Sequence, residues 1–172
     1  ARGKDYSPSM LDELLYSDRT LLDGWDKMAA IYSLEDWPYF FRYKLFQRQR
    51  ENPHRPSEEI RQEVLGDIQE RGPLSSLDFD NQEKADWYWG PTKIVRAALE
   101  SLFSEGYLGV HHRVSNRRYF DLIERLLPEQ LLTAPDPNAS AEAYQDWHIL
   151  RRVGSMGLVF PNAGEHWYGI LE

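Results

Sequence analysis

Apolar side chains along residues 1–56 recur at the three- and four-residue spacing that is typical of amphipathic helices. Ser7 followed by Pro8 can start one short helix, and Ser33 can cap a second one. The aromatic-rich stretch 25–31 between the two is expected to be buried. Because two prolines interrupt the pattern near its end, we predict an N-terminal helical segment over residues 1–56 that closes with a linker.

The next part of the chain changes to three helical patterns followed by two alternating ones. The predicted helices cover about residues 57–71, 74–79 and 92–105, and the predicted strands cover 107–113 and 118–122. This is the element order of a winged helix-turn-helix, in which the third helix enters the major groove and the two-stranded ribbon, or wing, contacts the backbone. We therefore predict a winged helix-turn-helix domain over residues 57–127.

The last part, residues 128–172, combines a predicted helix with a predicted hairpin. The helix covers 141–153 with Tyr144, Trp147, His148 and Leu150 as core, a turn follows at 154–157, and the hairpin strands lie at 158–160 and 166–170. We expect this part to belong to a further winged-helix unit. The predicted fold class is thus mainly α with small β (α+β), within a tandem winged-helix array.

Composition narrows the classes of function. The chain has 172 residues, of which 41% are hydrophobic, so it can bury a core. It has no cysteine, which excludes disulfides and thiolate zinc sites, and no apolar run that could span a membrane or serve as a secretory leader. We expect a cytoplasmic protein and, because Ala1 stands where an initiator Met would, a piece of a longer chain.

The charge distribution determines how such a chain could bind nucleic acid. A net charge of −8 argues against general polyanion binding, since DNA affinity depends largely on the release of phosphate counterions. Any DNA contact must therefore come from local basic patches. The predicted contacts lie on the third helix, the wing and the helix after Ser33: Thr92, Lys93, Arg96, Arg113, Asn116, Arg117, Arg118, Arg42, Lys44 and Arg48.

Three alternatives compete with this interpretation. Each basic run could be an ordinary solvated surface, the winged helix could serve protein contacts only, and the chain could be a transcription regulator that binds an operator as a dimer. Nothing in the sequence resembles a dimerising coiled coil or an effector pocket, so we expect a monomer that binds double-stranded DNA. Trp87 and Trp89 could stack on bases, but burial against the wing is favoured.

Other chemistry finds little support in the sequence. His111 and His112 are adjacent on a predicted strand, so they should face opposite sides of it and could not share a metal ion. The sequence contains no phosphate-binding glycine loop, no nucleophile elbow and no pair of helical histidines. We predict no catalytic residue, no metal and no cofactor in this chain.

Several phrases of the sequence resemble, in the same order, the AlkZ/YcaQ family of tandem winged-helix DNA glycosylases. They lie at residues 21–30, 34–38, 72–76, 87–93, 98–103, 147–154 and 167–170. The resemblance covers nearly the whole chain, and it depends on the shared order of the phrases because no single phrase is diagnostic.

The resemblance implies a bacterial DNA-repair hydrolase, nucleoid-associated when on DNA, that cleaves the N-glycosidic bond of bulky alkylated or cross-linked purines. Because N7 alkylation makes the base a cationic leaving group, the enzyme must chiefly position a water and stabilise an oxocarbenium-like sugar. The family uses a Gln-x-Gln or Gln-x-Asp motif that is expected upstream of Ala1, so this chain alone is expected to be inactive. Gln47-Arg48-Gln49 has that spacing in the wrong place and predicts exposed polar helix surface. Lys27 stands where many members have His.

Overall fold

The computed structural model describes residues 5–26, 28–162, 164, 167 and 170. Its elements are α1 (Pro8–Asp12), the π-helix η1 (Glu13–Ser17), β1 (Leu21–Trp25), β2 (Ala29–Ser33), the 3-10 helix η2 (Leu34–Asp36), α2 (Trp37–Gln49), α3 (Glu58–Arg71), β3 (Lys84–Ala85), β4 (Thr92–Lys93), α4 (Ile94–Ser104), β5 (Leu108–Val114), β6 (Arg117–Leu122), α5 (Ile123–Leu126), α6 (Glu129–Leu132) and α7 (Ala141–Met156). Helices dominate, and within the described residues the strands form antiparallel pairs β1–β2, β3–β4 and β5–β6. The predicted α+β class is confirmed. None of the described helices has the length and apolar character needed to cross a membrane.

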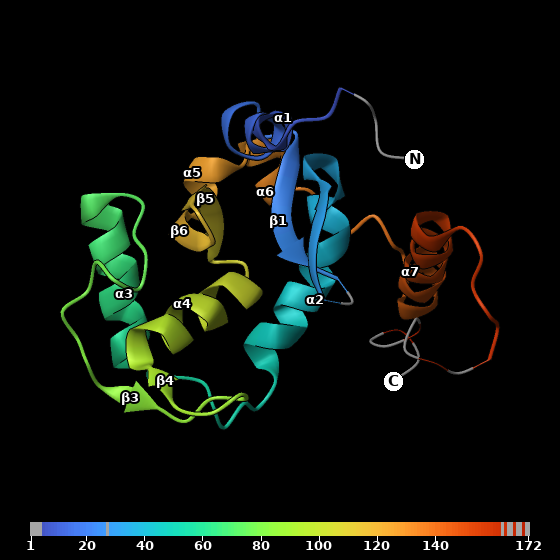
Figure 1. The fold of residues 1–172 in the computed structure, drawn as a ribbon. Coiled ribbons are helices and arrows are strands. Elements are labelled where there is room, and N and C mark those ends of the chain that lie inside the picture. The colour runs from blue at the N-terminus through green and yellow to red at the C-terminus, as the bar shows by residue number, and fades with distance from the viewer. Residues whose placement is uncertain (1–4, 27, 163, 165–166, 168–169, 171–172) are drawn as a thin grey trace.

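Figure 1 shows three regions side by side. Helices α3 and α4 with strands β3 to β6 form one region, the hairpin β1–β2 and helix α2 lie in the middle, and α7 lies beyond α2. Trp147 of α7 packs on α2, with its ring centroid 4.9 Å from that of Tyr39 and 5.3 Å from that of Phe40. Aromatic contacts therefore join the C-terminal helix to the middle region.

A β-hairpin lies inside the segment that the sequence predicts to be helical. Strands β1 and β2 pair along their full length. Because successive side chains of a strand face opposite sides, Leu22 and Tyr32 are buried, whereas Trp25 and Ile31 are 44% and 43% exposed. The expectation that residues 25–31 are buried is wrong for this reason.

Helix α2 begins where the pattern predicts. The Ser33 hydroxyl oxygen accepts a hydrogen bond from the backbone N–H of Glu35 at 3.4 Å and so caps η2, which leads directly into α2. Trp37 and Phe40 are buried in a core shared with β1, β2 and α5. Leu45, which belongs to the same predicted stripe, is half-exposed.

Residues 74–79 form a bridge and a turn instead of the predicted helix. Leu74 and Phe120 exchange both backbone hydrogen bonds, at 3.0 and 2.8 Å, so an extra chain segment lies beside β6. The Asp78 carboxylate then accepts hydrogen bonds from the backbone N–H and the hydroxyl of Ser75. These local bonds satisfy the backbone without a helix, and the prediction is wrong.

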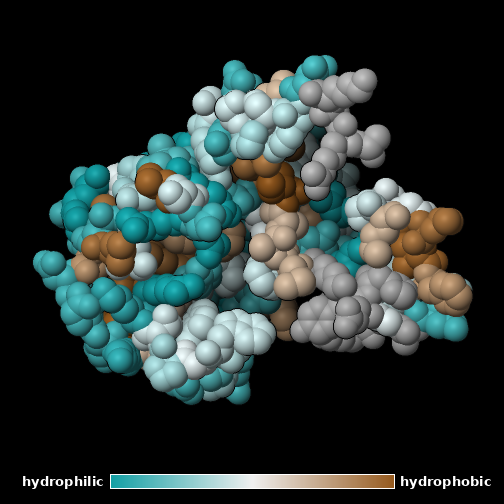
Figure 2. All heavy atoms as spheres, viewed as in Figure 1, coloured by the Kyte–Doolittle hydropathy of each residue, from teal (hydrophilic) through white to brown (hydrophobic). Residues whose placement is uncertain are grey.

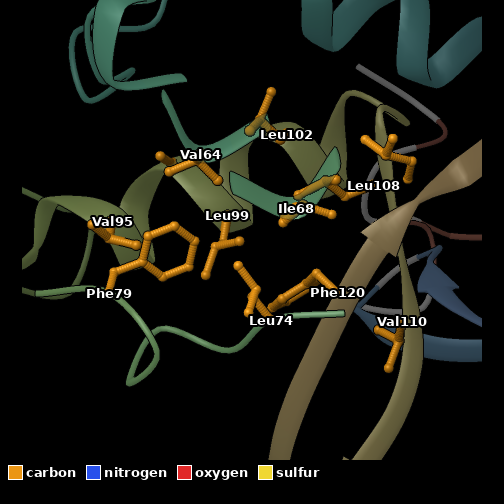
Figure 3. Close-up of a cluster of buried hydrophobic side chains, with 12 residues drawn as sticks. Val64, Ile68, Leu74, Phe79, Val95, Leu99, Leu102, Leu108, Val110 and Phe120 are labelled. Carbon is orange, nitrogen blue, oxygen red and sulfur yellow. The ribbon is translucent and has the colours of Figure 1, made fainter. Parts of the chain in front are cut away.

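Helix α4 and the hairpin β5–β6, which corresponds to the predicted wing, form the core of the first region, the one that contains α3, α4 and β3 to β6. α4 begins at Ile94, so Thr92 and Lys93 belong to β4 and not to the helix start that we predicted. In Figure 3, side chains of α4 meet those of α3 and the wing; the labelled core residues are Val64, Ile68, Leu74, Phe79, Val95, Leu99, Leu102, Leu108, Val110 and Phe120. The predicted strands are confirmed as β5 and β6. The order α3, bridge, turn, α4, β5–β6 is compatible with a winged helix whose second helix is replaced by a turn.

Helix α7 is longer than predicted. It continues to Met156 and ends at Gly157, which has a φ of +79°, so the turn predicted at 154–157 is wrong. A helix interior tolerates Gly154 at a cost of about 1 kcal/mol. His148 is buried as predicted, but Leu150 is 71% exposed. Figure 2 shows exposed apolar atoms in the region of α7, at the right of the view.

The predicted C-terminal hairpin is only partly within the described residues. Residues 158–160 are described and form no strand, so this half of the prediction is wrong. Most of the second strand, at 166–170, lies outside the described residues, as does Lys27.

Candidate nucleic-acid interface

A short ribbon precedes helix α4 and carries two lysines. Lys84 of β3 lies directly opposite Lys93 of β4. Opposite residues of an antiparallel pair place their side chains on the same face, about 5 Å apart at Cβ. The backbone N–H of Ile94 donates to the carbonyl of Glu83 at 2.8 Å, which joins the start of α4 to this ribbon. Two ammonium groups therefore share one face beside the helix start.

The first turn of α4 contains no acidic side chain. The N-cap residue of this helix is Lys93, whose side chain makes no capping hydrogen bond. The backbone N–H groups of a first turn carry the positive end of the helix dipole. Arg96 lies in this turn and is exposed. Positive charge thus accumulates at a position that favours anions.

The wing contacts α4 one turn further along. Glu100, four residues after Arg96, forms an ion pair with Arg118 of β6. The guanidinium of Arg118 also lies 5.1 Å from the centroid of the Phe120 ring. Because positions four apart share a helix face, Arg96 lies on the side of α4 that Arg118 of the wing contacts. Arg117 precedes Arg118 on the wing and is exposed.

The predicted DNA contacts divide into side chains that bond to no other group of the protein and side chains that do. Within the described part of the chain, the following make no side-chain hydrogen bond or ion pair: Thr92, Lys93, Arg96, Asn116 and Arg117. Four others bond to groups of the protein itself: Arg42, Arg48, Arg113 and Arg118. We call Lys84, Lys93, Arg96 and Arg117 together the cationic surface; the first three lie around the start of α4, and Arg117 lies on the wing, where its charge also acts on Asp78.

Arg42 and Arg113 each pair with a carboxylate. Arg113 lies 2.8 Å from Asp23, and Arg42 lies 2.7 Å from Asp136. Both arginines are partly exposed. A DNA phosphate would have to replace an existing partner at these positions, which reduces the gain from binding.

Two arginines of the remaining basic run, Arg48 and Arg55, converge with Arg61 of α3 on the buried residue Glu105. Glu105 is 2% exposed and accepts hydrogen bonds from both terminal nitrogens of Arg61, at 2.9 and 2.6 Å. Arg55 lies 3.2 Å from the same carboxylate, and Arg48 donates to the backbone carbonyl of Glu105 at 2.7 Å. These side chains line a polar cavity of about 270 Å³. Arg48, Arg55, Arg61 and Glu105 therefore form an internal ion-pair network.

Lys44, another predicted contact, is buried. Its ammonium nitrogen lies 4.5 Å from the centroid of the Trp37 ring and 3.5 Å from the hydroxyl oxygen of Tyr32. Burial, with a smaller contribution from the charge of Arg48, lowers the pKa of Lys44 to about 7. The prediction that Lys44 contacts DNA is wrong, because aromatic side chains enclose the ammonium group.

The two glutamines of the Gln-x-Gln spacing in α2 differ in exposure, although the sequence predicts that both are exposed. Gln47 is buried and Gln49 is exposed. The predicted polar surface is therefore correct for Gln49 only, since the side chain of Gln47 is buried.

The two adjacent histidines lie together, contrary to the prediction. A β-bulge between Val110 and His112 breaks the alternation of β5, and the Nδ1 atoms of His111 and His112 are 2.9 Å apart. Burial, followed by the charges of Arg19 and His112, lowers the pKa of His111. Within the described residues no third His, Cys, Asp or Glu joins them in a group that could hold a metal ion.

The loop between β3 and β4 presents a tryptophan to solvent. Trp89 is 94% exposed, whereas Trp87 is half-buried and its ring centroid lies 5.1 Å from that of Tyr88. The predicted burial is wrong for Trp89. Sequence reasoning also missed Lys84, because it lies in a polar stretch that predicts only a loop, and its pairing with Lys93 exists only in the folded chain.

The fold and the candidate interface define an α+β protein that is acidic as a whole and concentrates its free cations around the start of α4 and the wing. A family model described as DNA glycosylase AlkZ-like matches residues 1–172. The chain therefore belongs to the AlkZ-like DNA glycosylase family, which confirms the resemblance noted in the sequence. This is a family of DNA-repair hydrolases, and it implies DNA as the partner. No solved structure matches the chain.

Proposed function

We propose that this chain binds duplex DNA through the cationic surface, as part of a DNA glycosylase. One observation carries the proposal. Among the lysines and arginines that the structure describes, Lys84, Lys93, Arg96 and Arg117 make no hydrogen bond or ion pair, and all four lie on β3, β4, α4 or the wing. These are elements of the region 57–127, which we propose as the DNA-binding unit.

Free cations suit phosphate binding for a physical reason. Each one that contacts a phosphate releases a condensed counterion from the DNA without first breaking an internal ion pair. The first turn of α4 has no side-chain cap, so its backbone N–H groups other than that of Ile94 add donors next to Lys93 and Arg96. Thr92 and Asn116 supply neutral hydrogen-bonding groups next to these charges. The acidic remainder of the chain restricts binding to this surface.

We propose bulky alkylated or cross-linked purines as the lesions, in keeping with the family. An N7-alkylated purine leaves as a neutral base once the glycosidic bond breaks, so the reaction needs a positioned water and stabilisation of a cationic sugar. The contribution of residues 1–172 is to hold the duplex. A duplex that contains N7-alkylguanine should therefore bind at least as tightly as an undamaged one of the same sequence.

The test is the salt dependence of duplex binding, measured by fluorescence anisotropy. Each cation that contacts a phosphate contributes about 0.9 to the slope of log K against log salt concentration. Replacing Lys84, Lys93, Arg96 and Arg117 by Ala should reduce the magnitude of the slope by about 3 to 4 and weaken binding equally across sequences.

Arg42→Ala is the matched control, because it removes one positive charge at an arginine already paired with Asp136. It should leave the slope within about 0.3 of the parent value. Equal slopes for the parent and the fourfold variant would refute the proposal. No binding at low salt would instead favour a protein-interaction role for the winged helix.

A further inference from the structure

Trp89 is the most exposed aromatic side chain among the described residues. It is 94% exposed, although tryptophan is highly buried on average. It lies in the loop between β3 and β4, at the edge of the first region of Figure 1. An indole in this position makes little contribution to the core, and both faces of its ring are accessible to a ligand.

The loop around Trp89 is attached to the rest of the protein. The backbone N–H of Gly90 donates to the carbonyl of Trp87 at 2.9 Å, and Gly90 adopts a φ of +106° that favours glycine. The hydroxyl of Tyr88 accepts from Arg50 at 2.9 Å and donates to Asn52 at 2.9 Å. Hydrogen bonds made by the residues before and after Trp89 therefore fix the conformation of the loop.

The chain on either side of this loop carries phosphate-binding groups. Lys84 and Lys93 face each other at its base, and Arg96 follows in the first turn of α4. Proteins that hold single-stranded nucleic acid combine cations along the backbone with aromatic side chains on which bases stack. The ribbon has both components within a few residues of each other.

We infer that Trp89 stacks on an unpaired or displaced nucleobase while the neighbouring cations hold the flanking phosphates. This inference rests on the proposed function and narrows it to a class of substrate, a duplex with a local defect that exposes a base. A fully paired duplex offers no free base face, so the indole gains nothing there. Purines should be preferred over pyrimidines because their rings offer more surface to the indole.

The test compares two labelled duplexes, one fully paired and one with a single extrahelical purine, by fluorescence anisotropy. The wild-type chain should bind the bulged duplex more tightly. Trp89→Ala should reduce this preference about tenfold, the range expected for loss of one base–aromatic contact, and Trp89→Phe should retain most of it. A 2-aminopurine at the bulge should be quenched by the wild type and not by Trp89→Ala.

Trp25→Ala is the matched control, because Trp25 is another partly exposed tryptophan at the end of a different hairpin. It should keep the preference for the bulged duplex. Since the Trp89 side chain is nearly free of the core, thermal melting should show that Trp89→Ala folds normally.

The inference and the proposed function fail in different ways. If Trp89→Ala binds both duplexes as the wild type does, or loses affinity for both equally, the stacking role is overturned and the cationic surface is unaffected. If the alanine variants of Lys84, Lys93, Arg96 and Arg117 keep the salt slope of the parent, the proposed function is overturned instead.

Discussion

At the residue scale, two buried charged side chains, Glu105 and Lys44, have different environments. Glu105 is neutralised by Arg61 and Arg55. Within the described residues, Lys44 has no carboxylate within ion-pair distance and lies against aromatic rings. Burying an ion without a partner is costly, and proteins respond by favouring the neutral form. The lowered pKa of Lys44, about 7, reflects this cost.

Lys44→Met should stabilise the protein at pH 6. Below pH 7 the lysine is protonated in both states, so the wild type bears the full burial penalty. Between pH 7 and 10.5 the unfolded chain holds a proton that the folded chain lacks, so wild-type stability rises with pH. The advantage of Lys44→Met, measured by urea unfolding, should shrink by about 3 kcal/mol between pH 6 and 9.

The exposed Lys84 supplies the control for this prediction. Lys84→Met should change the free energy of unfolding by less than about 0.5 kcal/mol at either pH. A pH-independent effect of Lys44→Met would show that the ammonium group of Lys44 reaches water.

At the scale of elements, two glycines occupy different positions relative to a helix, one inside α3 and one after the end of α4. Gly66 lies within α3 with no atom near the position of an added Cβ. Gly106 follows α4 with a φ of +76°, and an added Cβ would lie 2.6 Å from a side-chain carbon of Lys44. The same substitution therefore has opposite physical effects at the two sites.

Gly66→Ala should stabilise the protein by about 0.5 to 1 kcal/mol, because alanine lowers the conformational entropy of the unfolded chain and suits a helix interior. Gly106→Ala should destabilise it by about 2 kcal/mol, through left-handed strain and the clash with Lys44. Thermal melting distinguishes the two directions. A shift of the same sign in both variants would contradict the backbone conformation given for Gly106.

At the scale of the whole molecule, two carboxylates connect α7 to the middle region: Asp36 pairs with Arg151 at 2.6 Å, and Asp26 pairs with other residues of α7. Asp26, in the turn after β1, accepts hydrogen bonds from His148 at 2.9 Å and from Arg152 at 2.8 Å. Burial alone would raise the pKa of Asp26, but these two hydrogen bonds outweigh it and lower the pKa to about 2. The ionised carboxylate therefore stabilises the docked position of α7.

Asp26→Asn should loosen α7, at a cost of about 2 kcal/mol, because it leaves Arg152 buried with a weaker partner. Hydrogen exchange over residues 141–156 should become faster. Because the folded pKa is lowered, the stabilisation is present above the ordinary pKa of aspartate, about 3.9, and is lost as pH falls toward 2. The difference in unfolding free energy between variant and wild type should shrink over that interval.

Asp67→Asn is the matched control, since Asp67 forms an ion pair with Arg71 on the exposed surface of α3. Its effect should stay below about 0.5 kcal/mol. If Asp26→Asn leaves exchange in α7 unchanged, the Arg151–Asp36 ion pair and the aromatic contacts of Trp147 are sufficient to hold that helix.

The sequence by itself determined the elements whose pattern is local. The inner faces of α3 and α4, the wing strands, the start of α2 and the family membership all follow from the order and spacing of side chains along the chain. Hydrophobic periodicity and capping act between residues a few positions apart, so both can be recognised from the sequence alone.

Only the tertiary structure decided which charges are free and which side chains are exposed. Arg113 meets Asp23, Arg61 meets Glu105 and Lys84 meets Lys93 across separate elements. The turn at 74–79 replaces a helix because Leu74 pairs with Phe120 far along the chain. Ion pairing and burial depend on distances between residues that are remote in sequence, and the chain acquires those distances only when it folds.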